Sequence, residues 1–160
     1  MEQISKTFNK IKVESNILYI IATPIGNLGD ISIRALKILS SLDIIFCEDK
    51  RITGKLLKNY GIKSAKLEIY NDHSDQKHRK LIINKIKNLN FKSGLVSDAG
   101  TPLISDPGYK LVKECIKNSI KITHVPGASS LTTSLVLSGL PSHNFFFGGF
   151  LVFWALKTMF

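Results

Sequence analysis

The sequence predicts an α/β protein: a mostly parallel five-stranded sheet with helices on both faces, followed by the start of a second α/β domain. Five apolar runs rich in β-branched residues start roughly every 23 to 28 residues, the length of one strand, one helix and two turns. Apolar residues between these runs recur at helical spacing. Such alternation is typical of parallel strands joined by right-handed helical crossovers.

The elements follow from these patterns in chain order. The predicted strands cover residues 17–22, 43–47, 66–70, 94–97 and 121–125. Ile31, Ala35, Ile38 and Leu42 lie on one side of a helix, and the same spacing recurs within residues 82–89 and 111–116. The first domain is therefore expected to span residues 17–125, after an N-terminal tail of residues 1–16.

A second domain is expected to begin after residue 125. Residues 128–140 are predicted to form an apolar helix that ends at Pro141, and residues 144–147 a sixth strand. Residues 126–151 are thus the expected beginning of this domain, and residues 152–160 an aberrant end. The open strand edges of this incomplete second domain would need a partner.

Composition limits the function. The chain has 160 residues, is 44% apolar and carries 22 Lys and Arg against 12 Asp and Glu, a net charge of +10. Residues 50–92 hold most of this excess, because this stretch contains twelve basic residues and only three carboxylates. Two interpretations stay open: solvated helix faces, or a flank that binds the phosphates of a nucleic acid.

Several classes are disfavoured. Cys47 and Cys115 are too few for a disulfide scaffold and offer no zinc spacing. His73 and His78 are expected in a solvated loop rather than a metal site, and no metal is predicted. The chain shows no secretion signal, and its longest apolar stretch, residues 145–156, is shorter than the roughly 20 residues of a membrane span. We expect a cytoplasmic protein without a membrane partner.

Glycine and proline gather in the loops that follow the first, fourth and fifth strands, at residues 23–30, 98–108 and 126–130. Ligands of parallel sheets bind at the carboxyl ends of the strands, so these loops form the candidate site. They contain no dinucleotide, Walker or hydrolase-elbow motif, since the first loop provides only Gly26-x-x-Gly29. Ordinary tight turns are the alternative for each loop taken alone.

Carboxylates stand at the same edge. Glu48 and Asp49 follow the second strand, and Asp98 and Asp106 bracket the long fourth loop. Such groups can bind a hydroxyl or orient a substrate, or they can cap the next helix. For Asp30 the helix-cap interpretation is preferred.

Three long stretches of the sequence, residues 18–31, 48–54 and 96–109, follow a recognisable pattern, which is extended by residues 125–128, 138–141 and 146–151. In these stretches the chain resembles the tetrapyrrole methylase superfamily, and within it the enzymes that methylate small-subunit ribosomal RNA. The run Ser97-Asp-Ala-Gly-Thr-Pro-Leu-Ile-Ser-Asp-Pro-Gly-Tyr109 is the most specific part. Lys50 stands where the family pattern leads us to expect Thr.

The resemblance implies a reaction and a set of site residues. The reaction is 2′-O-methylation of a cytidine ribose in 16S rRNA of the 30S subunit, expected at cytidine 1402, with S-adenosyl-L-methionine as methyl donor. The family fold has two α/β domains around the cofactor and forms homodimers. The implied cofactor residues are Pro24, Ala99, Gly100, Thr101, Ile104, Ser129 and Ser130. Asp49 and Asp98 are the candidates for activating or positioning the ribose hydroxyl.

The resemblance ends in the final residues. After Gly149-Phe-Leu151, the family pattern continues with a Pro- and Lys-containing segment, whereas this chain continues Val152-Phe-Trp154. We therefore expect a C-terminally truncated member, inactive alone unless a separate C-terminal fragment completes the cofactor cleft. Two alternatives to rRNA methylation are a non-catalytic, RNA-binding remnant and a methylase of tetrapyrrole precursors.

Overall fold

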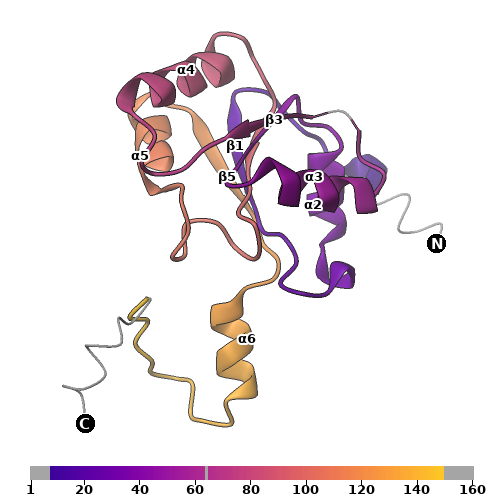
Figure 1. The fold of residues 1–160 in the computed structure, drawn as a ribbon, viewed down its shortest axis with the longest axis vertical. Coiled ribbons are helices and arrows are strands. Elements are labelled where there is room, and N and C mark those ends of the chain that lie inside the picture. Colours follow the sequence, from indigo (N-terminus) through magenta and orange to yellow (C-terminus); the bar gives the residue numbers. More distant parts are fainter. Residues whose placement is uncertain (1–7, 64, 150–160) are drawn as a thin grey trace. The chain divides into compact units, whose positions relative to one another are not determined.

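The computed structural model describes residues 8–63 and 65–149. The chain divides into two compact units, Met1–Ser129 and Ser130–Phe160 (Figure 1). The division lies a few residues beyond the expected domain boundary at residue 125, so the loop after the fifth strand belongs to the first unit.

The first unit is built on a five-stranded parallel sheet, as predicted. Its strands are β1 (Ile17–Ile21), β2 (Ile44–Cys47), β3 (Lys66–Ile69), β4 (Ser93–Leu95) and β5 (Lys121–Val125). Their order across the sheet is β3-β2-β4-β1-β5, and every pair is parallel. The strands β4, β1 and β5 are therefore neighbours, which brings the three glycine-containing loops together at one edge of the sheet.

Helices cover both faces of this sheet (Figure 1). One face buries Ile17, Tyr19 and Ile45 against α2 (Ile33–Leu39) and α3 (Lys50–Asn59). The other face buries Leu18 and Phe46 against α4 (Gln76–Lys87) and α5 (Tyr109–Lys117). Successive strand residues alternate between the two clusters, as the period of a β-strand requires. The predicted fold class is thus confirmed.

Helix starts are fixed by side-chain caps. Ser32 caps α2 by accepting a hydrogen bond from the amide of Ala35, and Asp75 caps α4 through the amide of His78. The prediction that Asp30 caps a helix is wrong. Asp30 ends a short 3₁₀ helix, Leu28–Asp30, whose cap is Asn27, and α2 starts only after Ser32.

Residues 8–16 are attached to the first unit. Ile11 and Val13 pack against the cluster under α2 and α3. The hydroxyl of Tyr19 accepts a hydrogen bond of 3.0 Å from the amide of Glu14.

The second unit contains α6 (Ser130–Leu137), shorter than the predicted helix of residues 128–140. Gly139 follows it with φ +68°, a left-handed conformation that ends helices. The predicted strand at residues 144–147 is wrong, because this segment has no regular structure. A strand needs a neighbour for its backbone hydrogen bonds, and the described part of this unit, residues 130–149, offers none.

The basic stretch of residues 50–92 is continuous in sequence but not in space. Its first part forms α3 on one face of the sheet, and its later part forms α4 on the other. The basic residues of this stretch are therefore divided between the two faces of the sheet. Within the described ranges, no helix is long and apolar enough to cross a membrane.

Candidate functional site at the carboxyl edge of the sheet

The loops after β1, β4 and β5 are joined by hydrogen bonds. Thr23 and Gly100 form an isolated antiparallel bridge, with N···O distances of 2.8 and 3.1 Å. The hydroxyl of Thr101 donates to the carbonyl oxygen of Ala128 at 3.0 Å. The edge that parallel α/β folds use for ligands is therefore a single connected surface here.

Two glycines permit this close approach. Gly100 has φ +84°, and a Cβ atom there would lie 3.2 Å from Cγ2 of Ile25. A Cβ atom on Gly127 would lie 3.0 Å from the Cβ of Ala22. Both distances are tighter than ordinary van der Waals contact, so larger residues would push the loops apart.

The structure brings most of the predicted cofactor residues to this edge. Pro24 and Gly100 are buried, Thr101 is half-buried, and Ala99 and Ile104 are exposed. Ser129 is half-buried at the end of the first unit. Ser130 begins α6 in the second unit, and the family resemblance alone assigns it to the site.

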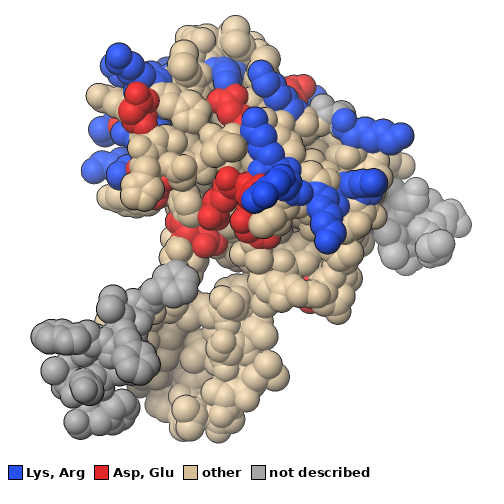
Figure 2. Space-filling model, viewed as in Figure 1, with Lys and Arg blue, Asp and Glu red and all other residues tan. Residues whose placement is uncertain are grey.

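Four carboxylates lie on the two loops after β2 and β4. Asp98 joins these loops, because its Oδ1 accepts a hydrogen bond of 3.2 Å from the amide of Asp49. Burial raises the pKa of Glu48, and the negative charges of Asp106 and Asp98 raise it further. Burial likewise raises the pKa of Asp106, with a contribution from Asp98. Figure 2 shows a group of acidic side chains near the centre of the view, with basic side chains directly beside it and further acidic side chains among the basic ones above.

Asp49 differs from its neighbours. Its carboxylate receives hydrogen bonds from the Arg51 side chain, the shortest being 2.6 Å, and from the Arg51 amide at 2.7 Å. These contacts lower the pKa of Asp49 to about 2. Asp49 is the N-cap of α3. Of the two roles that the sequence allows for these carboxylates, substrate binding and helix capping, Asp49 therefore has the second.

Two further carboxylates lie at this edge of the sheet, although the sequence alone does not assign them to the site. Glu48 and Asp106 share the edge with Asp98, and only their surroundings in the fold show how strongly the three groups interact. The sequence does carry a signal for both: Glu48 directly follows the second strand, and Asp106 lies within the fourth loop. The three are not arranged to share a metal ion, and no cluster of three metal-binding side chains occurs in the described ranges.

Asp72 is a site-supporting residue that sequence reasoning missed. Its carboxylate accepts hydrogen bonds from the Tyr70 hydroxyl at 3.0 Å and from the Gly108 amide at 3.3 Å. It therefore connects the segment after β3 to the end of the fourth loop. No spacing in the sequence relates Asp72 to Gly108, because the contact arises from packing of distant segments.

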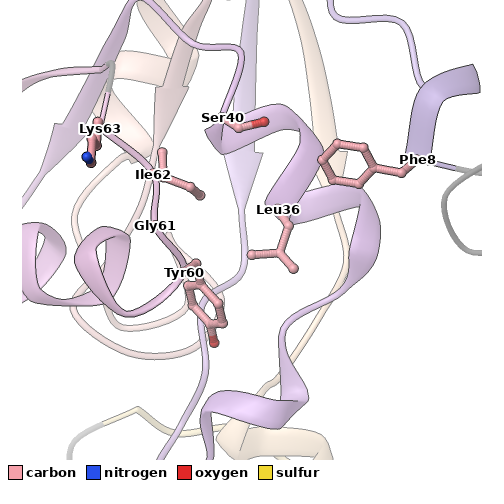
Figure 3. A pocket seen from close by; sticks show the side chains of 7 residues that line it. All are labelled: Phe8, Leu36, Ser40, Tyr60, Gly61, Ile62 and Lys63. Atoms are coloured by element: carbon pink, nitrogen blue, oxygen red, sulfur yellow. The ribbon is translucent and has the colours of Figure 1, made fainter. Parts of the chain in front are cut away.

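A cavity of about 470 Å³ lies elsewhere in the first unit (Figure 3). Phe8, Leu36 and Ser40 line it from the N-terminal segment and α2, and residues 60–63 from the turn after α3. Its lining is mainly apolar, and none of the candidate catalytic or cofactor residues belongs to it. We therefore assign the functional site to the loops, where glycines and carboxylates converge.

The carboxylate cluster predicts opposite pH effects for two substitutions. A raised pKa in the folded state stabilises the protein at low pH, and this contribution is lost as the pH rises through the folded-state pKa. Asp106→Asn should therefore raise the free energy of unfolding at pH 7.5, and its advantage should disappear below pH 4. Asp49→Ala should lower it at pH 7.5, because the lowered pKa contributes stability that is lost only as the pH falls toward about 2.

Urea unfolding at a series of pH values measures both effects. Asp49→Ala serves as the matched control, since it removes a carboxylate from the same edge of the sheet. If Asp106→Asn were destabilising at pH 7.5 and neutral at pH 3, the raised pKa of Asp106, caused first by its burial and then by the charge of Asp98, would be contradicted.

Fold and site together define the class. A parallel α/β domain with connected glycine loops at its carboxyl edge is built to bind a small ligand there. The chain belongs to the family of tetrapyrrole (corrin/porphyrin) methylases, whose model matches residues 17–158. The family resemblance found in the loop sequences is thereby confirmed.

The chain is similar to curated proteins that bear the name "Ribosomal RNA small subunit methyltransferase I". It is 57% identical to that of Rickettsia prowazekii over 134 residues, which cover 84% of this chain and 47% of the relative. It is 50% identical to the Vibrio cholerae protein, covering 84% and 46%, and 47% identical to the Pasteurella multocida protein, covering 86% and 48%. The chain thus spans about half the length of these relatives.

Proposed function

We propose that this chain provides the first domain of an S-adenosylmethionine-dependent methyltransferase that modifies a cytidine 2′-hydroxyl in small-subunit ribosomal RNA. The observation that carries the proposal is the connected surface of three loops, in which Gly100 and Gly127 allow close backbone approach. The relatives named as rRNA methyltransferases support the choice of substrate.

The loop residues fit the cofactor. Ala99 and Ala128 have small side chains, and the absence of a Cβ at Gly100 lets Ile25 and the backbone of Ala128 lie close to it. Backbone amides and small side chains suit the close approach of a nucleoside and its amino-acid part. When bound, S-adenosylmethionine would supply an electrophilic methyl group beside this surface.

Asp98 is the residue that we propose to position or deprotonate the ribose hydroxyl. A hydroxyl is a weak nucleophile until a base takes its proton, so a carboxylate at the site would increase the rate. Asp98 lies beside Glu48 and Asp106, and the pKa values of those two carboxyl groups are raised by their burial and by the charge of Asp98. Asp49 stays a weaker candidate, because Arg51 and the α3 amides already bind its carboxylate.

The second unit exposes an apolar surface that is suited to binding a polypeptide partner. Val136, Leu137, Leu140 and Phe146 are each more than 70% exposed, and α6 carries no charged residue. Exposed apolar groups of this size mark interaction surfaces. We propose that the remainder of the methylase fold covers them, either in a homodimer or as a separate C-terminal fragment.

A methyl-transfer assay tests the function. The chain would be mixed with 30S subunits and radiolabelled S-adenosylmethionine, with and without a polypeptide that corresponds to the unmatched half of the Rickettsia relative. With the second polypeptide present, we expect labelled 2′-O-methylcytidine among the nucleosides of the digested rRNA. Asp98→Asn should reduce the rate by about a hundredfold.

Asp43→Asn is the matched control, since Asp43 lies before β2 and binds the Lys92 amide at 2.8 Å, at the amino end of the sheet. It should leave the rate unchanged. Equal rates for Asp98→Asn and the wild type would remove Asp98 from the chemistry. RNA binding without transfer would favour the non-catalytic remnant, and transfer to a tetrapyrrole precursor instead of rRNA would favour that alternative.

A further inference from the structure

The helices α4 and α5 form a basic surface whose parts lie far apart in sequence. They pack side by side over the face of the sheet that buries Leu18 and Phe46. Together they carry eight Lys and Arg and one carboxylate, that of Glu114. Figure 2 shows basic side chains over the region where Figure 1 places these two helices. This surface requires the fold, because α5 lies outside the basic stretch of residues 50–92.

A groove of about 570 Å³ runs between the two helices. Its polar lining consists of Lys80, Asn84, Lys87, Asn88, Glu114 and Asn118. Lysine supplies the positive charge and asparagine the neutral donors and acceptors that suit a sugar-phosphate backbone. Since an anion would meet two ammonium groups here, the groove is chemically suited to phosphates.

Several of these side chains are already held in place. Nζ of Lys87 donates to the carbonyl oxygen of Asn118 at 3.0 Å, across the groove. Nδ2 of Asn88 donates to Oδ1 of Asn84 at 2.6 Å. The carboxylate of Glu114 is paired with Lys117 at 3.2 Å, which offsets its repulsion of an anion. Lys80 is exposed and forms no ion pair with any residue that the structure describes.

The outer side of α5 adds an aromatic group. Tyr109, Lys113 and Lys117 follow one another at i, i+4 spacing, and the Tyr109 side chain is 62% exposed. Nζ of Lys113 lies 6.0 Å from the centre of the Tyr109 ring. An exposed aromatic ring beside lysines is the combination that binds single-stranded nucleic acids, through base stacking and charge.

We propose that the α4–α5 surface binds a single-stranded segment of RNA, with the backbone in the groove and one base stacked on Tyr109. This inference rests on the proposed function for the identity of the RNA. Tyr109 directly follows Gly108, the end of the loop that holds Asp98 and Asp106. The groove lies toward the C-terminal ends of both helices. The bound segment would therefore extend from the carboxyl edge of the sheet, where methyl transfer is proposed, along α5 toward the opposite edge.

Fluorescence anisotropy with a labelled oligouridine 12-mer tests the surface without any cofactor. The double variant Lys80→Gln/Lys87→Gln should reduce the slope of log Kobs against log salt concentration by about 1.4, the value for two lost contacts with a single strand. The matched control Lys55→Gln/Lys58→Gln removes the same charge from α3, on the other face of the sheet. It should change the slope little. Equal losses in both variants would show diffuse attraction and overturn the proposal.

Tyr109 provides a second, independent readout. Tyr109→Ala should weaken oligouridine binding roughly tenfold, whereas Tyr109→Phe should keep it, because stacking needs only the ring. Binding of inorganic polyphosphate should not respond to Tyr109→Ala, since this polymer has no bases. A tyrosine variant that binds oligouridine like the wild type would overturn the stacking assignment. Failure of methyl transfer with intact oligouridine binding would refute the proposed function and leave the RNA surface standing.

Discussion

Replacing Gly108 by alanine is expected to lower the free energy of unfolding by about 3 kcal/mol. Gly108 has φ +139°, a conformation that side chains strongly disfavour. An added Cβ would also lie 2.8 Å from Cδ1 of Leu103 and from Cδ2 of Leu95. Relieving these contacts would displace the Gly108 amide from the carboxylate of Asp72, so the end of the site loop would move as well.

Gly54→Ala is the matched control for this measurement. Gly54 lies inside α3, and the nearest atom to an added Cβ is Cδ1 of Leu67 at 3.8 Å. Alanine there should stabilise the protein by about 0.5–1 kcal/mol, because glycine is a poor helix former. Urea unfolding followed by circular dichroism compares the two. A neutral Gly108→Ala would mean that the fourth loop adapts without strain.

Replacing Phe46 by alanine should have the larger effect, a loss of about 4 kcal/mol. Phe46 is fully buried at the centre of β2, where it is paired with Glu68 of β3 and Leu95 of β4. Its side chain fills the core under α4 and α5, so truncation leaves a cavity there. The loss should also loosen the support of the proposed RNA surface.

Ile69→Ala gives the comparison on the neighbouring strand. Ile69 ends β3, at the edge of the sheet, and is 48% exposed. Its truncation should lower the free energy of unfolding by only about 0.5 kcal/mol. Equal losses for the two variants in chemical unfolding would contradict the placement of Phe46 in the core.

Most of the first domain could be predicted from sequence, because strand and helix patterns are local. The predicted strand at residues 121–125 matches β5 at both ends, and the other four differ by one or two residues. The helix α3 is not among the predicted elements, because its sequence has no clear apolar stripe. In the structure this helix buries only Thr53 and Leu57. The wrong strand at residues 144–147 shows the limit of local patterns: an apolar, aromatic run becomes a strand only where a neighbour pairs with it.

The site was predicted only in part. The glycine loops were correctly placed on one edge, since the carboxyl ends of parallel strands meet there. The interactions among the carboxylates could not be predicted. Asp49 turns its carboxylate to Arg51 and α3, whereas Glu48 and Asp106 interact with Asp98, and these differences arise from contacts between separate loops.

The sequence by itself determined the alternation of strands and helices, the chemistry of the loops and the membership of the methylase family. These properties follow from residue periodicity and from glycine, proline and carboxylate positions, which act over a few neighbouring residues. Only the tertiary structure decided the strand order, the contact of Asp72 with Gly108, and the fate of the basic stretch. Right-handed crossovers place α3 and α4 on opposite faces, so lysines adjacent in sequence are separated. Packing then joins α4 to α5 and creates a basic groove that no linear segment contains.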